Sequence, residues 1–149
     1  YRSLAADRGV SVACNLPRGS SVDQGKERTM KLFSTKTHGV LDYLSVGTLL
    51  ALPRMLGWSE SVKMLLTNAA IGTLGYSLLT RYELGLWKKL PMKGHLALDA
   101  MSGAMLLAAP LMFPDEDGSV KGALVGLGIF ELTAALTTET EPSLREQLT

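Results

Sequence analysis

Apolar residues gather into four long stretches of the chain, at 40–56, 62–80, 95–113 and 120–137. Each stretch has about the 17 to 20 residues that a helix needs to cross roughly 30 Å of hydrocarbon. The second stretch is the clearest, because no charged residue occurs between Met64 and Thr80. The pattern predicts an all-α, polytopic membrane protein with four transmembrane helices.

A soluble four-helix bundle is the competing interpretation. It would need a polar stripe at helical spacing on every helix, and the segment 64–80 offers only threonine, asparagine, serine and tyrosine for one. The first and fourth stretches are less uniform, since Asp42 and Arg54 interrupt the first and Glu131 interrupts the fourth. Length and charge together favour the membrane interpretation.

The four stretches form two copies of one two-helix unit. When residues 36–55 are laid over 93–112, ten of the twenty positions are identical. The identical positions are Lys36/Lys93, His38/His95, Leu41/Leu98, Asp42/Asp99, Ser45/Ser102, Leu49/Leu106, Leu50/Leu107, Ala51/Ala108, Pro53/Pro110 and Met55/Met112. With one inserted residue the match continues through pairs such as Val62/Val120, Leu66/Leu124 and Thr80/Thr138.

The repeat defines the predicted organisation of the chain. Repeat 1 covers 36–83 and repeat 2 covers 93–141, within a four-helix transmembrane domain at 36–141. A polar tail at 1–35, predicted to be disordered, precedes this domain, and a short tail at 142–149 follows it. Because each copy contains two crossings, the two copies enter the membrane from the same side as parallel repeats.

Lysine and arginine predict which side that is. They are frequent before the first stretch and between the second and third, whereas the opposite connections hold only Arg54, Lys63 and Lys121 beside several acidic residues. By the positive-inside rule, both termini and the central connection are predicted to be cytoplasmic.

The tandem two-helix unit, with a proline near the end of its first helix, resembles the SPW-repeat family of bacterial membrane proteins. The proline stands in Leu52-Pro53-Arg54 and Ala109-Pro110-Leu111, where the serine and tryptophan of the family's tripeptide are not retained. The stretches KTHGVLDY, GYSLLTRYELG and LPMKGHLALD are also similar to such proteins. The resemblance covers 36–141 and implies a bacterial inner-membrane protein, while the family brings no established activity.

Composition excludes several functions. A net charge of +1 and 6% aromatic residues do not mark a nucleic-acid surface. A single cysteine excludes an intramolecular disulfide framework. The sequence contains no phosphate-binding loop, nucleophile elbow or HExxH motif. The prediction is therefore a non-enzymatic protein with a structural or accessory role, embedded in the lipid bilayer.

His38 with Asp42 and His95 with Asp99 are the main candidate site residues. Each pair is spaced i and i+4, so the two side chains share one helix face within hydrogen-bonding reach. A carboxylate beside an imidazole suits a metal or haem ligand or a proton relay. The plainer interpretation is that the pairs hold the two halves together. The alternative is a haem-binding redox protein with His38 and His95 as ligands.

Glu131 is a separate candidate, because it lies near the middle of the fourth stretch. A carboxylate at membrane depth is a functional candidate by default. It is predicted to bond Asn68, Thr73 or Tyr76, either as structural glue or as the working group of a small proton-coupled carrier. Ser45 and Ser102, one turn beyond the aspartates, and the pair Gly122 and Gly126, a predicted homo-oligomer contact, complete the candidates.

Overall fold

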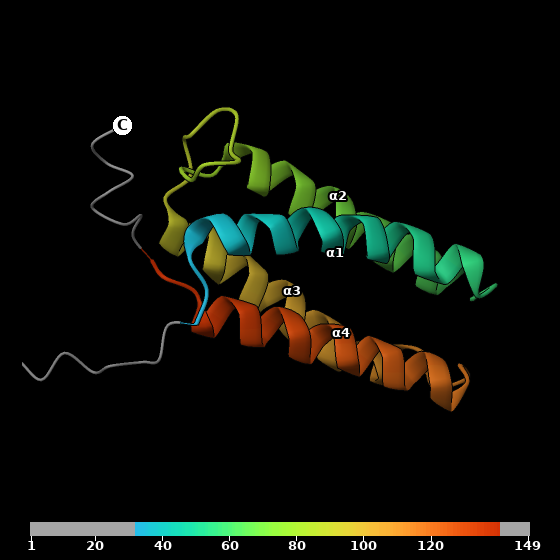
Figure 1. The fold of residues 1–149 in the computed structure, drawn as a ribbon. Coiled ribbons are helices and arrows are strands. Elements are labelled where there is room, and N and C mark those ends of the chain that lie inside the picture. The colour runs from blue at the N-terminus through green and yellow to red at the C-terminus, as the bar shows by residue number, and fades with distance from the viewer. Residues whose placement is uncertain (1–31, 141–149) are drawn as a thin grey trace, which may run out of the picture.

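The computed structural model describes residues 32–140 of the 149-residue chain, and this part folds into four helices (Figure 1). The helices are α1 (Thr35–Met55), α2 (Glu60–Leu79), α3 (Met92–Met112) and α4 (Gly118–Thr137). The all-α prediction is confirmed for this part of the chain. Most of the predicted N-terminal tail and all of the tail at 142–149 lie outside the described residues.

Local hydrogen bonds set the ends of the helices. α1 and α2 follow the serines Ser34 and Ser59, whose side chains each accept a hydrogen bond from a backbone N–H in the first turn. α1 ends at Met55, and Gly57 follows it with a φ of +67°, so that the N–H of Trp58 bonds the carbonyl of Pro53. This is the Schellman arrangement, in which glycine takes the left-handed conformation at low cost.

Both α1 and α3 extend beyond the apolar stretches of the sequence. α1 starts at Thr35 and α3 at Met92, so each histidine lies in the first turns of its helix. Hydropathy did not predict these starts, because a helix bonds its backbone whether its side chains are apolar or polar. Pro53 and Pro110 lie inside the last turns of the helices, which end two residues later.

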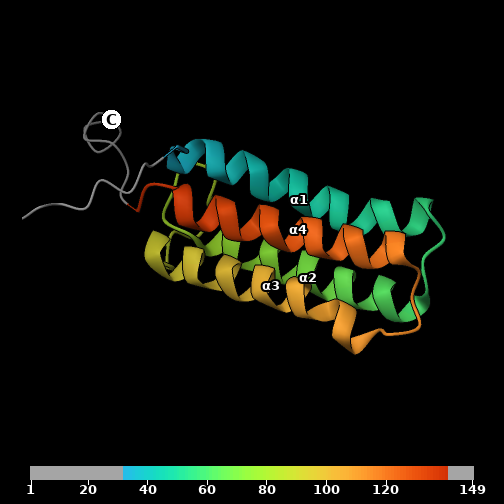
Figure 2. The same ribbon diagram turned by 90° about the horizontal axis from the view of Figure 1, so that it is seen from below.

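The helices form two antiparallel hairpins, α1 with α2 and α3 with α4, that lie side by side as one bundle (Figures 1 and 2). α1 and α3 begin at the same end of the bundle, which also holds the connection from α2 to α3. At this end the N–H of Leu32 bonds the carbonyl of Thr137, so both ends of the described chain meet there. We call it the terminal end, and the other the distal end.

The core is apolar toward the distal end and polar toward the terminal end. Four leucines, one from each helix, have no exposed surface: Leu49, Leu66, Leu106 and Leu124. They are two of the aligned pairs of the sequence repeat. The buried polar residues lie mostly in the half of each helix nearer the terminal end: Thr35, His38, Asp42, Thr73, Ser77, Thr80, His95, Asp99, Glu131 and Thr138.

α3 and α4 approach each other closely at two glycines. A Cβ atom on Gly128 would lie 2.7 Å from the carbonyl oxygen of Gly103, and one on Gly103 would lie 3.0 Å from that of Gly128. Only glycine permits backbones to approach this closely. By contrast, Gly122 and Gly126 are exposed, and no atom lies within 4 Å of a Cβ placed on either. Their role as an oligomer contact stays a prediction.

By length and composition, two of the helices are apolar enough to cross a membrane, α3 and α4. α1 and α2 are 21 and 20 residues long but fall short on composition. The sequence-based prediction of four crossings is therefore supported by hydropathy for the second hairpin alone.

Candidate functional site

Two histidine–aspartate pairs meet in the interior of the bundle. α1 supplies His38 and Asp42, and α3 supplies His95 and Asp99, each pair one turn apart on the inward face of its helix. None of the four residues is more than 6% exposed. We call these four residues the His/Asp quartet.

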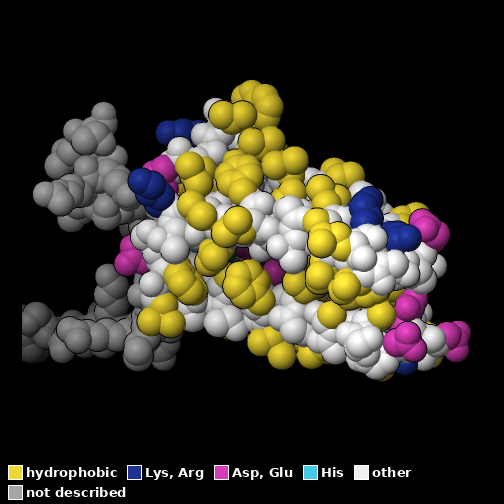
Figure 3. Space-filling model, turned by 45° about the vertical axis from the view of Figure 1, so that its right-hand side comes forward, with side chains coloured by type: hydrophobic (Ala, Val, Ile, Leu, Met, Phe, Trp, Pro, Cys, Tyr) yellow, Lys and Arg dark blue, Asp and Glu magenta, His cyan; other side chains and the backbone are white. Residues whose placement is uncertain are grey.

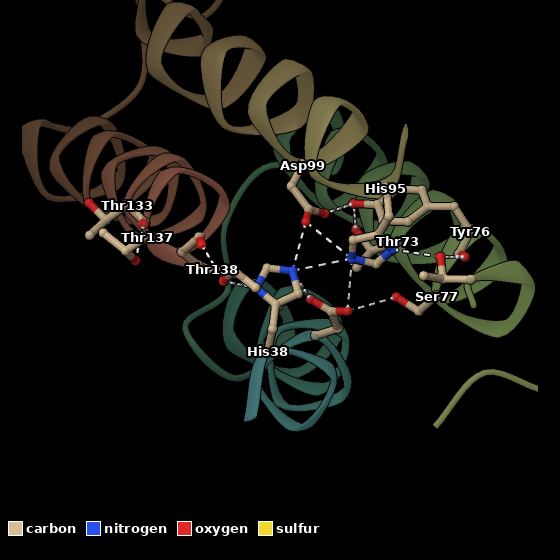
Figure 4. A network of polar contacts seen from close by, with 12 residues as sticks. His38, Thr73, Tyr76, Ser77, His95, Asp99, Thr133, Thr137 and Thr138 are labelled. Carbon is tan, nitrogen blue, oxygen red and sulfur yellow. Dashed lines mark hydrogen bonds and ion pairs between the residues drawn. The ribbon is translucent and has the colours of Figure 1, made fainter. Parts of the chain in front are cut away.

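Each imidazole contacts both carboxylates. His38 Nε2 lies 3.3 Å from Asp42 Oδ1 and 2.9 Å from Asp99 Oδ2. His95 Nε2 lies 3.1 Å from Asp99 Oδ2 and also 3.1 Å from Asp42 Oδ2. The two Nε2 atoms are 3.2 Å apart (Figure 4). The histidine–aspartate contacts predicted within each helix are thus present. Each histidine also contacts the aspartate of the other helix.

Two threonines hold the outer nitrogens of the imidazoles. Thr80, which follows α2, lies 2.8 Å from His95 Nδ1, and Thr138, which follows α4, lies 2.8 Å from His38 Nδ1. Each threonine hydroxyl donates its single proton to a backbone carbonyl at 2.6 Å. It can therefore only accept from the histidine, so both Nδ1 atoms carry a proton and both Nε2 atoms point to the centre of the quartet.

α2 also supplies hydroxyl donors to the carboxylates. Tyr76 donates to Asp99 Oδ1 at 2.6 Å, and Ser77 donates to Asp42 Oδ2 at 3.1 Å (Figure 4). The Tyr76 ring stands edge-on to the ring of His95, with centroids 4.9 Å apart. With Thr138 beyond α4, residues from or adjoining all four helices converge on the site.

Tyr82 covers the quartet from the connection between α2 and α3. Its ring is 3% exposed and its centroid lies 5.8 Å from that of His95. Gly39 leaves the space for it, since a Cβ at that position would lie 2.0 Å from the ring. Burial raises the pKa of the Tyr82 hydroxyl above its usual value, so this residue adds no charge to the site.

Glu131 lies beside the quartet but does not bond it directly. It borders a cavity of about 10 Å³ with Asp42, Asp99, Ser45 and Thr73, which is close to the least space that one water molecule needs. Its Oε2 atom is buried and has no hydrogen-bond partner among residues 32–140. Figure 3 shows acidic side chains within a hollow near the middle of one face of the bundle.

The other predicted residues divide into those near the site and one far from it. Ser45 lines the cavity, and Ser102 has a buried hydroxyl without a partner in the described part of the chain. The prediction that Asn68 bonds Glu131 is wrong, because Asn68 is exposed and lines an open groove with Arg54 and Lys63. The rotation of α2 about its axis turns this side chain away from the core.

The histidines are too close together for a haem. A bis-histidine haem places its macrocycle between the two ligand nitrogens. Here these nitrogens are 3.2 Å apart and both contact the same two carboxylates. The geometry therefore argues against the haem alternative.

Sequence reasoning missed the partners of the quartet. Thr80 and Thr138 were visible as an identical pair of the repeat, and that identity was the only signal for their role. Tyr76 is one of three alternative partners that the sequence suggests for Glu131, whereas in the structure it bonds Asp99. Partner choice depends on how the helices are rotated and packed, which spacing along one helix does not reveal.

The quartet combines two imidazole nitrogens and two carboxylates within one buried cluster, and these are the atoms that hold transition-metal ions or exchange protons in proteins. Comparison with models of known protein families, with curated proteins and with solved structures found no match to this chain. The function is therefore inferred from the chain's own sequence and geometry.

Proposed function

We propose that this chain is an integral protein of the bacterial inner membrane, in which all four helices cross the bilayer and the His/Asp quartet joins the two hairpins. Its function is structural or accessory, as a rigid membrane bundle. The observation that carries the proposal is the distribution of polarity: a cluster of ionisable and hydroxyl side chains lies inside the bundle, while many large apolar side chains are exposed on its outside.

The outer surface supports this function. Within residues 32–140, eighteen large hydrophobic residues are exposed, among them Leu44, Ile71, Met101 and Leu136, each more than 60% exposed. Large exposed apolar patches are uncommon on soluble monomers. A soluble core helix would also be mostly buried, whereas only 33% of the apolar window of α3 and 28% of that of α4 are buried.

The composition of α1 and α2 is compatible with crossing. At 1.5 Å per residue both helices are about 30 Å long. Asp42 lowers the hydropathy of α1, but its side chain lies inside the bundle, where it contacts both histidines of the quartet. Arg54, Glu60 and Lys63 lie at the distal end, where charges can reach water.

The tandem repeat is supported by duplicated contacts. His38 bonds Thr138 as His95 bonds Thr80, and isolated bridges join Phe33 to Thr138 and Thr80 to Leu90. In each case the two residues of the second contact are the ones that align, in the sequence repeat, with the two residues of the first. The resemblance to the SPW-repeat family remains a prediction, and it is the basis for the choice of the bacterial inner membrane.

Cysteine labelling tests the proposed crossing and its direction. In a Cys14→Ser background, we expect Ser61→Cys and Gly118→Cys, both at the exposed distal end, to react with an impermeant thiol reagent in intact cells. Trp87→Cys, at the terminal end and 60% exposed in the wild type, should react only after lysis. The reason is that basic residues at the terminal end resist translocation.

Two labelling results would contradict the proposal. Reaction of Trp87→Cys alone in intact cells would reverse the orientation. Recovery of the protein in the soluble fraction after lysis would remove the membrane assignment altogether.

A proton-coupled carrier is the second candidate, because Glu131, whose Oε2 atom is buried without a hydrogen-bond partner in the described part of the chain, borders a cavity that also reaches Asp42 and Asp99. If the function is structural, proteoliposomes that contain the protein should take up no more protons than protein-free vesicles. The Glu131→Gln variant should fold normally, because the amide can still form hydrogen bonds. A proton flux that is lost in Glu131→Gln and kept in the control Glu139→Gln would favour the carrier.

A further inference from the structure

We infer that the His/Asp quartet is a binding site for one divalent transition-metal ion of the zinc type. The ligands are Nε2 of His38, Nε2 of His95 and one carboxylate oxygen each from Asp42 and Asp99. This inference goes beyond the proposed structural function and does not depend on the membrane assignment, since it rests on contacts inside the bundle.

The spacing of the four ligand atoms is that of a tetrahedral site. Zinc binds nitrogen and oxygen at about 2.0–2.2 Å, so neighbouring ligand atoms of a tetrahedron lie roughly 3.3–3.6 Å apart. The nitrogen–nitrogen distance is 3.2 Å, and Asp99 Oδ2 lies 2.9 and 3.1 Å from the two nitrogens. Asp42 reaches His38 through Oδ1 at 3.3 Å and His95 through Oδ2 at 3.1 Å, and one ligand atom from each of the four residues lies within 4.8 Å of all the others. Moving each side chain outward by a few tenths of an ångström would admit the ion.

The threonines prepare the histidines for this role. Because Thr80 and Thr138 accept the Nδ1 protons, the Nε2 atoms are the ones that can present lone pairs to a cation. Metal-binding histidines commonly use the other ring nitrogen in this way to donate to an oxygen, which fixes the ring orientation. His38 from α1 and His95 from α3 are therefore oriented in the same way.

Charge provides an independent argument. Two ionised carboxylates buried at this depth need their charge balanced. With protons alone, neutrality requires two further protons shared among the two imidazoles and the two carboxylates, around Nε2 atoms that face each other across 3.2 Å. One divalent ion gives the same neutrality, and it provides a partner for both nitrogens at once.

The ligand set indicates the class of metal and its role. Two imidazoles with two carboxylates suit borderline divalent ions such as zinc better than the thiolate-seeking or all-oxygen classes. Four protein ligands close a tetrahedral zinc site, which is typical of structural and not catalytic zinc. The ion would clamp α1 to α3 and so join the two hairpins.

The test uses the full chain, purified in detergent without a histidine tag and stripped of metal with a chelator. After addition of Zn²⁺ and removal of the excess, we expect elemental analysis to find one zinc per chain and the thermal unfolding midpoint to rise. The His38→Ala/His95→Ala variant should bind none. Co²⁺ in place of zinc should produce the intense visible bands of a tetrahedral nitrogen–oxygen site.

Threonine variants test the arrangement without removing a ligand. Thr80→Val and Thr138→Val should each weaken zinc binding by about 10- to 100-fold, because valine has the shape of threonine but cannot accept the Nδ1 proton. Thr137→Val is the matched control. The Thr137 hydroxyl also donates to a backbone carbonyl, at 2.6 Å, but it does not bond a histidine. The zinc affinity of Thr137→Val should therefore equal that of the wild type.

Folded wild-type protein that takes up no zinc, shows no rise in unfolding temperature and gives no cobalt bands would overturn the inference and leave an ion-pair quartet. Equal zinc affinity of Thr80→Val, Thr138→Val and Thr137→Val would overturn the assigned orientation of the ligands. If the alanine variant does not fold, the wild-type stoichiometry and cobalt spectrum decide alone. Either result is independent of the labelling experiment, so failure of the membrane proposal would be recognised separately.

Discussion

Asp99→Ala should lower the free energy of unfolding by about 3–5 kcal/mol, the range found when one partner of a buried ion pair is removed. Asp99 accepts from Tyr76 at 2.6 Å and contacts both histidines, at 2.9 and 3.1 Å. Its loss leaves a buried hydroxyl and two buried imidazoles without their shared acceptor. Asp42→Ala should cost less, because the contacts of Asp42 to the two histidines are no shorter than 3.1 Å.

Equilibrium unfolding of the metal-free protein in mixed micelles, with a chelator present, measures this cost. Asp115→Ala is the matched control, since Asp115 is exposed in the connection between α3 and α4 and should be neutral. The double variant of Asp42 and Asp99 should cost less than the sum of the single variants, because the two residues share one network. An Asp99→Ala protein as stable as the Asp115→Ala control would mean that the quartet does not hold the fold.

Gly128→Ala should destabilise the bundle by about 1–3 kcal/mol, as overpacking of a close interface does. The new Cβ would lie 2.7 Å from the carbonyl oxygen of Gly103 and 2.9 Å from the backbone nitrogen of Leu107. Backbone atoms cannot rotate away as the end of a side chain can, so α3 and α4 must separate. The same unfolding measurement tests this prediction.

Gly126→Ala, two residues earlier in the same helix, is the control with the opposite sign. Its Cβ would meet open space, and alanine has a helix propensity up to about 1 kcal/mol better than glycine. It should therefore be neutral or stabilising. A Gly126→Ala protein that loses more stability than Gly128→Ala would show that Gly126 packs against another molecule, as the predicted oligomer contact requires.

The sequence by itself determined the four helices, and the aligned pairs of its repeat included four leucines of the core between them. Four apolar stretches predicted four helices, because hydropathy and backbone hydrogen bonding act over a few neighbouring residues. The aligned pairs of the repeat already included Leu49 with Leu106 and Leu66 with Leu124, which are fully buried. The i, i+4 spacing placed each aspartate beside its histidine, and those contacts are present at 3.3 and 3.1 Å.

Only the tertiary structure decided which residues meet across the helices. The rotation of each helix about its axis depends on the packing of all four, so no single segment determines it. That rotation turned Asn68 outward, brought Thr80 and Thr138 to the histidines, and placed Gly103 against Gly128 where α3 and α4 cross. It also brought the two histidines and two aspartates of the quartet into one cluster. They come from two helices that are far apart in the sequence, and such residues become neighbours only when the hairpins pack.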